Sequence, residues 1–262
     1  MRGGIYLWPR MPSLESYNRV FTNPKIVNAY FITISRTVVG VASALLVTAL
    51  MAYALSNKKL VGRRFYSLFC IIPMYFGGGL IPWYMLIRNL GLMNTFWVYI
   101  IPNLVMLFNV ILMRTFFQEI PEALKESAQI DGANHLTVFF KIILPVSTPI
   151  LATIALFIGV FHWNAWFDAT IFINIDELKP MQNILLRIIN EASYAERMAA
   201  LAGGSGGAAA AQAMGAIARG RAVNVRSLTM ATMFVTIFPV LIIYPFVQRF
   251  FVRGIMIGSV KG

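Results

Sequence analysis

The chain has 262 residues, of which 58% are hydrophobic and only 12% are charged, a composition too apolar for a soluble domain of this size. Its formal charge of +12 would suggest nucleic acid in a soluble chain. Here the basic residues lie in short segments beside apolar runs, where they set membrane orientation. The sequence therefore indicates a polytopic membrane protein and disfavours nucleic-acid binding.

The first 28 residues are polar and interrupted by Pro9, Pro12 and Pro24. They lack the basic start, apolar centre and cleavage site of a signal peptide, so we expect residues 1–28 to form a loop on the outer side. Residues 29–262 are expected to form one all-α transmembrane domain.

Five apolar stretches are long enough to cross a bilayer core, which needs roughly 20 residues per helix. In chain order they are 37–55, with a start as early as Tyr30, then 65–87, 96–113, 142–167 and 228–247. Basic residues gather in three of the intervening or terminal segments, and all three fall on one side if every stretch crosses once. The positive-inside rule makes that side the cytoplasm, which leaves the N-terminal end outside and the C-terminal end inside.

The cytoplasmic segment 118–141 has the pattern of two short helices joined by a turn. Good helix formers follow Pro121 and predict a helix over 121–130, which ends at Asp131-Gly132 because glycine accepts a left-handed backbone. Asn134 is suited to cap a second helix, and Pro145 predicts a bend into the next apolar stretch. A narrow apolar stripe on the first helix suits a groove in a partner protein; its members are Ile120, Leu124, Ser127 and Ala128.

This segment resembles the EAA loop of permease subunits of binding-protein-dependent ABC importers. Glu126-Ser127-Ala128, Gly132 and Ile142-x-Leu144-Pro145 match the pattern in type and spacing, except that Ser127 replaces an alanine. The resemblance implies a type I importer permease fold, a polytopic helical bundle with five of six spans present and a first helix expected upstream. It also implies that the loop docks into an ATPase subunit through the residues Glu122, Ala123, Glu126, Ser127, Ala128, Asp131, Gly132, Ile142, Leu144 and Pro145.

The same resemblance implies the partners and the class of protein. The chain carries no P-loop motif, so ATP and Mg²⁺ belong to a separate ATPase subunit, and this chain holds no cofactor and is not an enzyme. A second permease, identical or different, an extracytoplasmic binding protein, membrane lipid and a saccharide are the other expected partners, in a bacterial cell membrane. The tail, residues 244–262, is similar to carbohydrate-type permeases of an oligosaccharide or uronate subgroup. Cys70 is the single cysteine, which excludes an internal disulfide.

Polar residues inside apolar stretches point to a transport path, because burying them in lipid is costly. Aromatic faces beside hydrogen-bonding groups suit a sugar, and the alternative is an aromatic belt at the outer interface. The candidates are Asn103, Asn109, His162, Trp163, Asn164 and Trp166, together with Asp168 and with Arg36 at the edge of the first span.

The outer segment 174–227 is long and contains an amphipathic pattern over 181–201, which serves either packing against other outer loops or docking of an external binding protein. The glycine- and alanine-rich stretch 203–220 is expected to be flexible, and its G-x-S-x-G match lacks the strand that a hydrolase site needs. Gly77, Gly78 and Gly79 indicate either close helix packing or a local break.

A secondary transporter or channel is the alternative function, with His162 or Asp168 as a proton relay. It explains the hydropathy but does not account for the spaced EAA-like loop.

Overall fold

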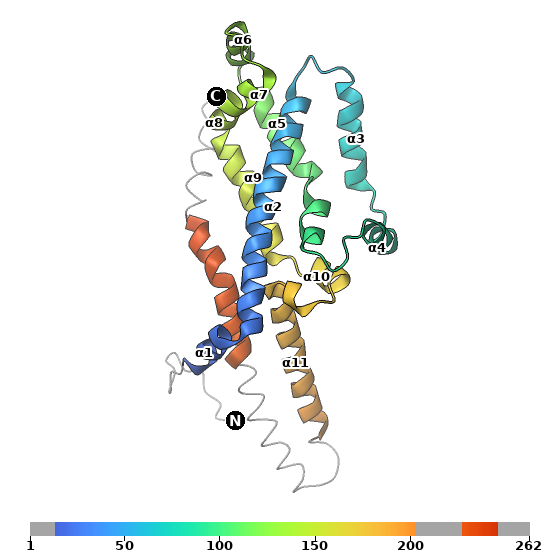
Figure 1. Ribbon diagram of the computed structural model, residues 1–262, viewed down its shortest axis with the longest axis vertical. Helices are drawn as coiled ribbons and strands as arrows, with labels where there is room; N and C mark the ends of the chain where they lie inside the picture. Colours follow the sequence, from blue (N-terminus) through green and yellow to red (C-terminus); the bar gives the residue numbers. More distant parts are fainter. Residues whose placement is uncertain (1–13, 203–226, 246–262) are drawn as a thin grey trace.

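The computed structural model describes residues 14–202 and 227–245. Residues 1–13, the glycine-rich stretch within 203–226 and the tail motif beyond Pro245 lie outside the described residues. Within the described part of the chain, every regular element is a helix (Figure 1).

The longest helix, α2 (Pro24–Ser56), is the central element of the bundle. Its first turn is well specified, since Pro24 occupies a first-turn position where a missing N–H costs nothing and the Asn23 side chain accepts a hydrogen bond from the Lys25 amide. A short helix, α1 (Glu15–Thr22), precedes it. The expectation of a loop over residues 1–28 is therefore wrong for the described residues 15–22 and 24–28, which are helical.

Three of the other expected spans are bent pairs of helices. α3 (Arg63–Tyr75) and α4 (Leu80–Asn89) meet at 118°, and the 3₁₀ turns η1 (Phe96–Tyr99) and η2 (Ile101–Asn103) meet α5 (Leu107–Glu119) at 47°. The run of α7 (His135–Val138), the π-helical η3 (Phe139–Ile143) and α8 (Leu144–Val146) meets α9 (Thr148–Asn164) at 84°. By length and composition, α2 and the Ser227–Pro245 helix are able to cross a membrane, and the number rises to five if each bent pair is one span.

The sharpest bend lies at the three consecutive glycines. Gly79 has a φ of +82°, which side-chain-bearing residues rarely adopt, and no atom lies within 4 Å of a Cβ built at Gly77, Gly78 or Gly79. Close packing does not explain these glycines, so the structure selects the local break. The bend before α9 falls at Ser147, two residues after Pro145, close to the predicted position.

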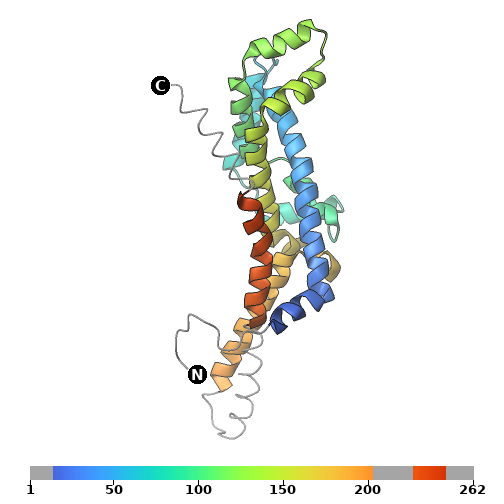
Figure 2. The same cartoon turned by 90° about the vertical axis from the view of Figure 1, so that its left-hand side faces the viewer.

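The main core lies where α2 packs against α5 and α9. Small residues of α2, Ala44 and Ala52, are fully buried there against Val110, Met113 and Ile154. A second cluster surrounds Tyr99 and Phe172 near α10 (Phe167–Phe172). The Ser227–Pro245 helix runs beside α2 and α9 (Figure 2).

The two ends of the bundle carry different loops. The short helix α6 (Glu122–Ile130) lies across one end, and α11 (Met181–Ala202), joined to α10 through η4 (Asp176–Leu178), extends beyond the other (Figures 1 and 2). The expected helix over 181–201 is confirmed. The EAA-like loop and α11 thus lie at opposite ends of the bundle.

Candidate functional site

The EAA-like loop is built around α6, which forms over 122–130, one residue later than expected because Pro121 precedes the helix. Its end is a Schellman motif: the Ala133 amide donates to the Ala128 carbonyl at 2.9 Å, and the Gly132 amide donates to the Gln129 carbonyl at 3.0 Å. Gly132 has the left-handed φ of +84° that this motif requires. The glycine therefore sets the direction in which the chain leaves α6.

The second short helix begins as predicted. The Asn134 side-chain oxygen accepts a hydrogen bond from the Thr137 amide at 2.8 Å, which caps α7. Phe139 and Ile143 then enter the main core, and Ile142 and Leu144 pack partly buried against it, whereas Pro145 stays exposed. Ile142 and Leu144 of the EAA-like pattern thus connect the loop to the bundle.

The stripe predicted to fit a partner groove is divided between two environments. Ile120 is buried and Ala128 is partly buried against the main core, so these two contact their own chain. Leu124 is 44% exposed and Ser127 is exposed, together with Glu122, Ala123, Glu126, Asp131 and Gly132. Only the exposed part is free to meet a partner.

Two lysines of the α2–α3 loop pair with α6. Lys58 Nζ lies 3.5 Å from Glu122 Oε2, and Lys59 Nζ lies 3.9 Å from Glu126 Oε1. Exposed pairs of this kind contribute at most about 1 kcal/mol each, so they orient α6 more than they stabilise the fold. The sequence pattern identified these lysines only as markers of the cytoplasmic side, and their pairing with α6 was missed.

A polar cavity of about 600 Å³ lies beneath these pairs, between the ends of α2, α5 and α6. Lys125 lines it and donates from Nζ to the Phe117 carbonyl at 3.4 Å. Burial lowers the pKa of the Lys125 ammonium, opposed by nearby Glu122 and assisted by Lys58.

A second cavity, of about 300 Å³, lies beyond the far end of α9. It is lined by three of the six residues predicted on the substrate path, Asn103, Asn164 and Trp166. Trp83 of α4 and Asp168 of α10 line it as well. Trp83 was not predicted, since nothing in its own stretch distinguishes it from a lipid-facing residue until the α3–α4 bend brings it here.

The other three predicted residues lie elsewhere. Asn109 is buried in α5, with Nδ2 3.5 Å from the Met106 sulfur. Trp163 is buried and donates from Nε1 to the Thr236 carbonyl at 3.2 Å. His162 is 1% exposed and packs against Gly40 of α2. None of the three lines the 300 Å³ cavity, so the structure places them apart from Asn103, Asn164 and Trp166.

A buried ion pair lies behind this cavity. Arg36, predicted at the edge of the first span, lies in α2, 12 residues after its start, and is fully buried. Its guanidinium binds both carboxylate oxygens of Asp168, donates to the Ala165 carbonyl at 3.0 Å and lies 4.2 Å from the centre of the Tyr99 ring. The pair joins α2 to α10, and its Asp168 member also lines the cavity.

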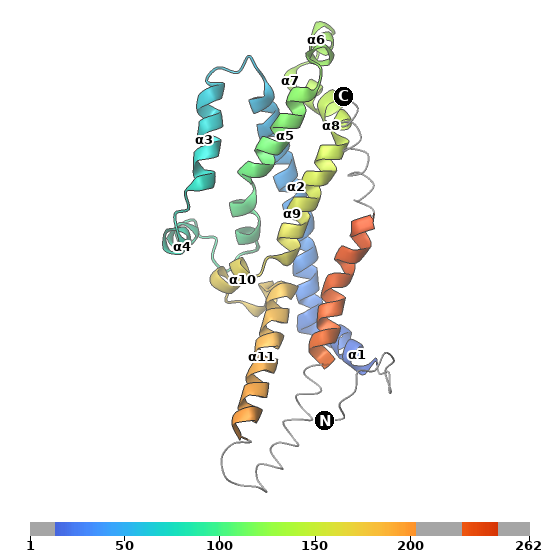
Figure 3. The same cartoon turned by 180° about the vertical axis from the view of Figure 1, so that it is seen from behind.

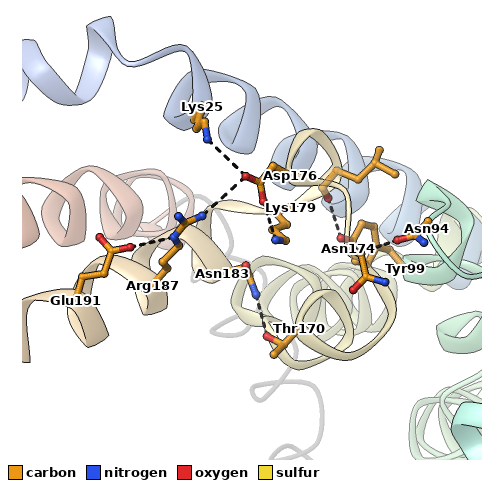
Figure 4. Close-up of polar contacts among 11 residues, drawn as sticks. Lys25, Asn94, Tyr99, Thr170, Asn174, Asp176, Lys179, Asn183, Arg187 and Glu191 are labelled. Atoms are coloured by element: carbon orange, nitrogen blue, oxygen red, sulfur yellow. Dashed lines mark hydrogen bonds and ion pairs between the residues drawn. The ribbon is translucent and has the colours of Figure 1, made fainter. Parts of the chain in front are cut away.

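The base of α11 is held by a polar network around Asp176 (Figure 4). Lys179 Nζ lies 2.7 Å from Asp176 Oδ1, and Lys25 and Arg187 approach Oδ2 at 3.5 and 3.9 Å. The hydrogen bond and charge of Lys179, followed by those of Lys25, lower the pKa of the Asp176 carboxyl. The network links α2, η4 and α11.

A protein-family model and individual relatives both match this chain. Residues 44–257 match the model of the family described as "Binding-protein-dependent transport system inner membrane component". The chain is 36% identical over 256 residues to the polygalacturonan/rhamnogalacturonan transport system permease protein YtcP of Bacillus subtilis, covering 98% of this chain and 84% of that protein. It is 35% identical over 258 residues to protein LplC of the same organism, covering 98% and 82%.

A solved structure is similar over most of the chain. It is a chain of a bacterial ABC transporter involved in the import of the acidic polysaccharide alginate, with a TM-score of 0.80 and 30% identity, covering 95% of this chain and 84% of that one. The present chain therefore belongs to the family of binding-protein-dependent transport system inner membrane components, the sugar ABC transporter permeases, which are transport subunits and not enzymes.

Proposed function

We propose that this chain forms one membrane-spanning half of an ATP-driven sugar importer in which α6 is the contact point for an ATPase subunit. The observation that carries the proposal is the placement of α6. It lies exposed across one end of the bundle, and its exit is fixed by Gly132. ATP and Mg²⁺ would be held by the ATPase subunit.

Displacement of α6 would reach the spans by two routes. One runs through the Schellman turn and α7 into η3, α8 and α9. The other runs through Lys58 and Lys59, which join α6 to the end of α2. Because α2 and α9 pack on each other along the core, a movement entering by either route would tilt both helices.

The proposed topology places α6 in the cytoplasm and α11 outside, with the N-terminal end outside and the C-terminal end inside. An extracytoplasmic binding protein would deliver the substrate on the side of α11, and a second permease, identical or different, would complete the pathway. The substrate that we propose is a saccharide containing uronic acid. Relatives named for polygalacturonan/rhamnogalacturonan transport and for alginate import favour it, and a cavity that combines Trp83 and Trp166 with amide side chains suits a saccharide in general.

Substitution of Gly132 tests the coupling. A Cβ at this position meets no atom within 4 Å, so Gly132→Val adds backbone strain without a clash. A left-handed backbone costs a side-chain-bearing residue about 1–2 kcal/mol, and asparagine tolerates it better. Gly91, which follows α4, is the matched control. It has a φ of +68°, and a Cβ built there also meets no atom within 4 Å.

The assay is uptake of oligogalacturonate by cells or vesicles that contain the whole transporter, with ATP hydrolysis measured in parallel. We expect Gly132→Val to reduce uptake strongly at normal membrane levels, Gly132→Asn to retain most of it, and Gly91→Val to leave it near the wild-type rate. Equal uptake by both valine variants would contradict the coupling role. Uptake that survives ATP depletion would instead favour a secondary transporter.

A further inference from the structure

Two amide side chains of the 300 Å³ cavity keep an oxygen free to accept hydrogen bonds. Asn103 Nδ2 donates to the Tyr99 carbonyl at 3.2 Å, and Asn164 Nδ2 donates to the Val160 carbonyl at 3.0 Å. Each amide nitrogen is therefore bonded to the preceding turn of its own segment. Among the described residues nothing donates to either amide oxygen, so both oxygens remain as acceptors.

Asp168 adds a third acceptor to the cavity. Its Oδ1 accepts from the Ala169 amide at 2.8 Å and from Arg36 Nη1 at 3.3 Å, and its Oδ2 accepts from Arg36 Nη2. A carboxylate offers about four lone-pair sites, so one site on Oδ2 stays open. The side chain is 16% exposed and lines the cavity, so a ligand there is able to contact the carboxylate.

The cavity wall offers no matching cation. Of the described residues that line it, Asp168 alone is ionisable. Its partner Arg36 has no exposed side-chain surface, and the guanidinium is occupied by Asp168 and the Ala165 carbonyl. A carboxylate ligand needs a cation or several N–H donors in place of its water, and here it would face an oxygen-rich wall with a negative charge. Hydroxyl groups, which donate, fit such a wall.

Two tryptophans line the same cavity. Trp83 of α4 and Trp166, just before α10, are 40% and 43% exposed. Figure 3 shows α4 and α10 at the same level of the bundle, and the cavity lies where these segments meet. Aromatic rings beside a few placed polar groups are a common lining of small-ligand sites, and the C–H face of a sugar ring packs on such rings while its hydroxyls reach the acceptors.

We propose that this cavity binds the hydroxyl-bearing edge of a sugar ring and that Asp168 determines its specificity, because its carboxylate accepts from hydroxyls and repels another carboxylate. The inference rests on the proposed function and narrows it. A neutral sugar unit fits the cavity directly, whereas a uronic acid unit would bind with its own carboxylate turned away from Asp168. This selection is a property of the permease chain and is separate from selection by a binding protein.

The experiment uses the whole transporter that contains this chain, purified in mild detergent without its binding protein, so that selection by that protein does not enter. The probes are digalacturonate, its methyl ester and a digalactoside of the same linkage, which share their ring hydroxyls and differ at carbon 6. Dissociation constants come from titrations followed by saturation-transfer NMR. We expect the two neutral probes to bind about fivefold to tenfold more tightly than digalacturonate, the scale of one hydrogen bond.

A pair of tryptophan variants tests where the sugar binds. Trp83→Ala should weaken binding of the digalactoside about threefold to tenfold, the scale of one aromatic contact. Trp97→Ala is the matched control, because Trp97 is 55% exposed but does not line the cavity. It should bind the digalactoside as the wild type does.

Asp168→Asn tests the selection itself. Without the negative charge, digalacturonate should bind at least as tightly as the digalactoside. Because this change leaves Arg36 without a charged partner, the double variant Arg36→Met with Asp168→Leu is measured alongside, since it removes both charges. In the double variant the digalactoside should lose its advantage over digalacturonate, because neither the acceptor nor the repelling charge remains.

Three results overturn the proposal. The first is that none of the probes binds to the wild type, or that digalacturonate binds as tightly as the neutral probes. The second is an equal loss of binding in Trp83→Ala and Trp97→Ala, which would place the sugar elsewhere. The third is a preference for neutral probes that persists in the double variant. All three leave ATP-driven uptake and its loss in Gly132→Val untouched, so failure of this inference is distinguishable from failure of the proposed function.

Discussion

The buried pair of Arg36 and Asp168 offers the sharpest test of how this bundle is held together. Asp168→Asn keeps the shape of the side chain but removes its charge. Arg36 has no exposed surface, so its guanidinium would be left with neutral partners only: the amide oxygen of the substituted side chain, the Ala165 carbonyl and the Tyr99 ring. Breaking a buried ion pair by removing one partner costs about 3–5 kcal/mol, because an uncompensated charge stays behind.

The assay is the thermal midpoint of the purified chain in detergent. At about 2–4 °C for each kcal/mol, Asp168→Asn is expected to lower the midpoint by about 6–20 °C. Arg187→Gln is the control, since Arg187 pairs with Asp176 and Glu191 at more than half exposure, where a pair contributes at most about 1 kcal/mol.

The double variant Arg36→Met with Asp168→Leu separates charge from packing. Replacing both members by apolar groups removes the uncompensated charge, so most of the lost stability should return. If Asp168→Asn and Arg187→Gln lower the midpoint equally, or if the double variant is less stable than Asp168→Asn alone, the argument from burial is refuted.

Two further predictions follow from single contacts. A Cβ on Gly40 would clash with the ring of His162, so Gly40→Ala should destabilise the chain by about 1–3 kcal/mol in thermal unfolding. Gly159→Ala is the control and should have little effect, because the nearest atom to its Cβ lies at 3.5 Å. Equal effects of the two variants would contradict this account. The pKa of the Asp176 carboxyl is lowered in the folded chain, so its ionised form stabilises the fold fully above the ordinary pKa near 3.8. That stabilisation is lost as the pH falls through the lower pKa of the folded chain. The midpoint difference between wild type and Asp176→Asn should therefore be constant from pH 7 to pH 5 and shrink below pH 4; a difference that instead grows on acidification would refute the assignment.

Several of the contacts described above involve α2 or the loop that follows it, which bears on the proposed coupling. At one end, the lysine pairs and the Schellman turn hold α6 against α2 and the run into α9. Further along α2, the Arg36–Asp168 pair holds this helix against α10, beside the cavity lined by Asn103, Asn164 and Trp166. Both sets of contacts involve α2 or the loop that follows it, so in the proposed mechanism this helix would carry movement of α6 towards the cavity.

The sequence by itself determined the features that depend on local chemistry. Hydropathy placed the five apolar stretches, and the Gly132 and Asn134 signals placed the turn and the cap of the EAA-like loop, because a left-handed glycine and an Asn cap act within a few residues. The spacing of Glu126, Gly132 and Pro145 also identified the family.

Only the tertiary structure decided which distant residues meet. Arg36 and Asp168 are 132 residues apart, and a charge inside an apolar stretch does not reveal its partner until the helices pack. The same holds for Lys58 with Glu122 and for the division of Asn109 and Asn103 between core and cavity. The directions of the helices also came only from the tertiary structure. The bend at Gly77–Gly79 brings Trp83 to the cavity, whereas a hydropathy pattern records the length of an apolar stretch but not its direction in space.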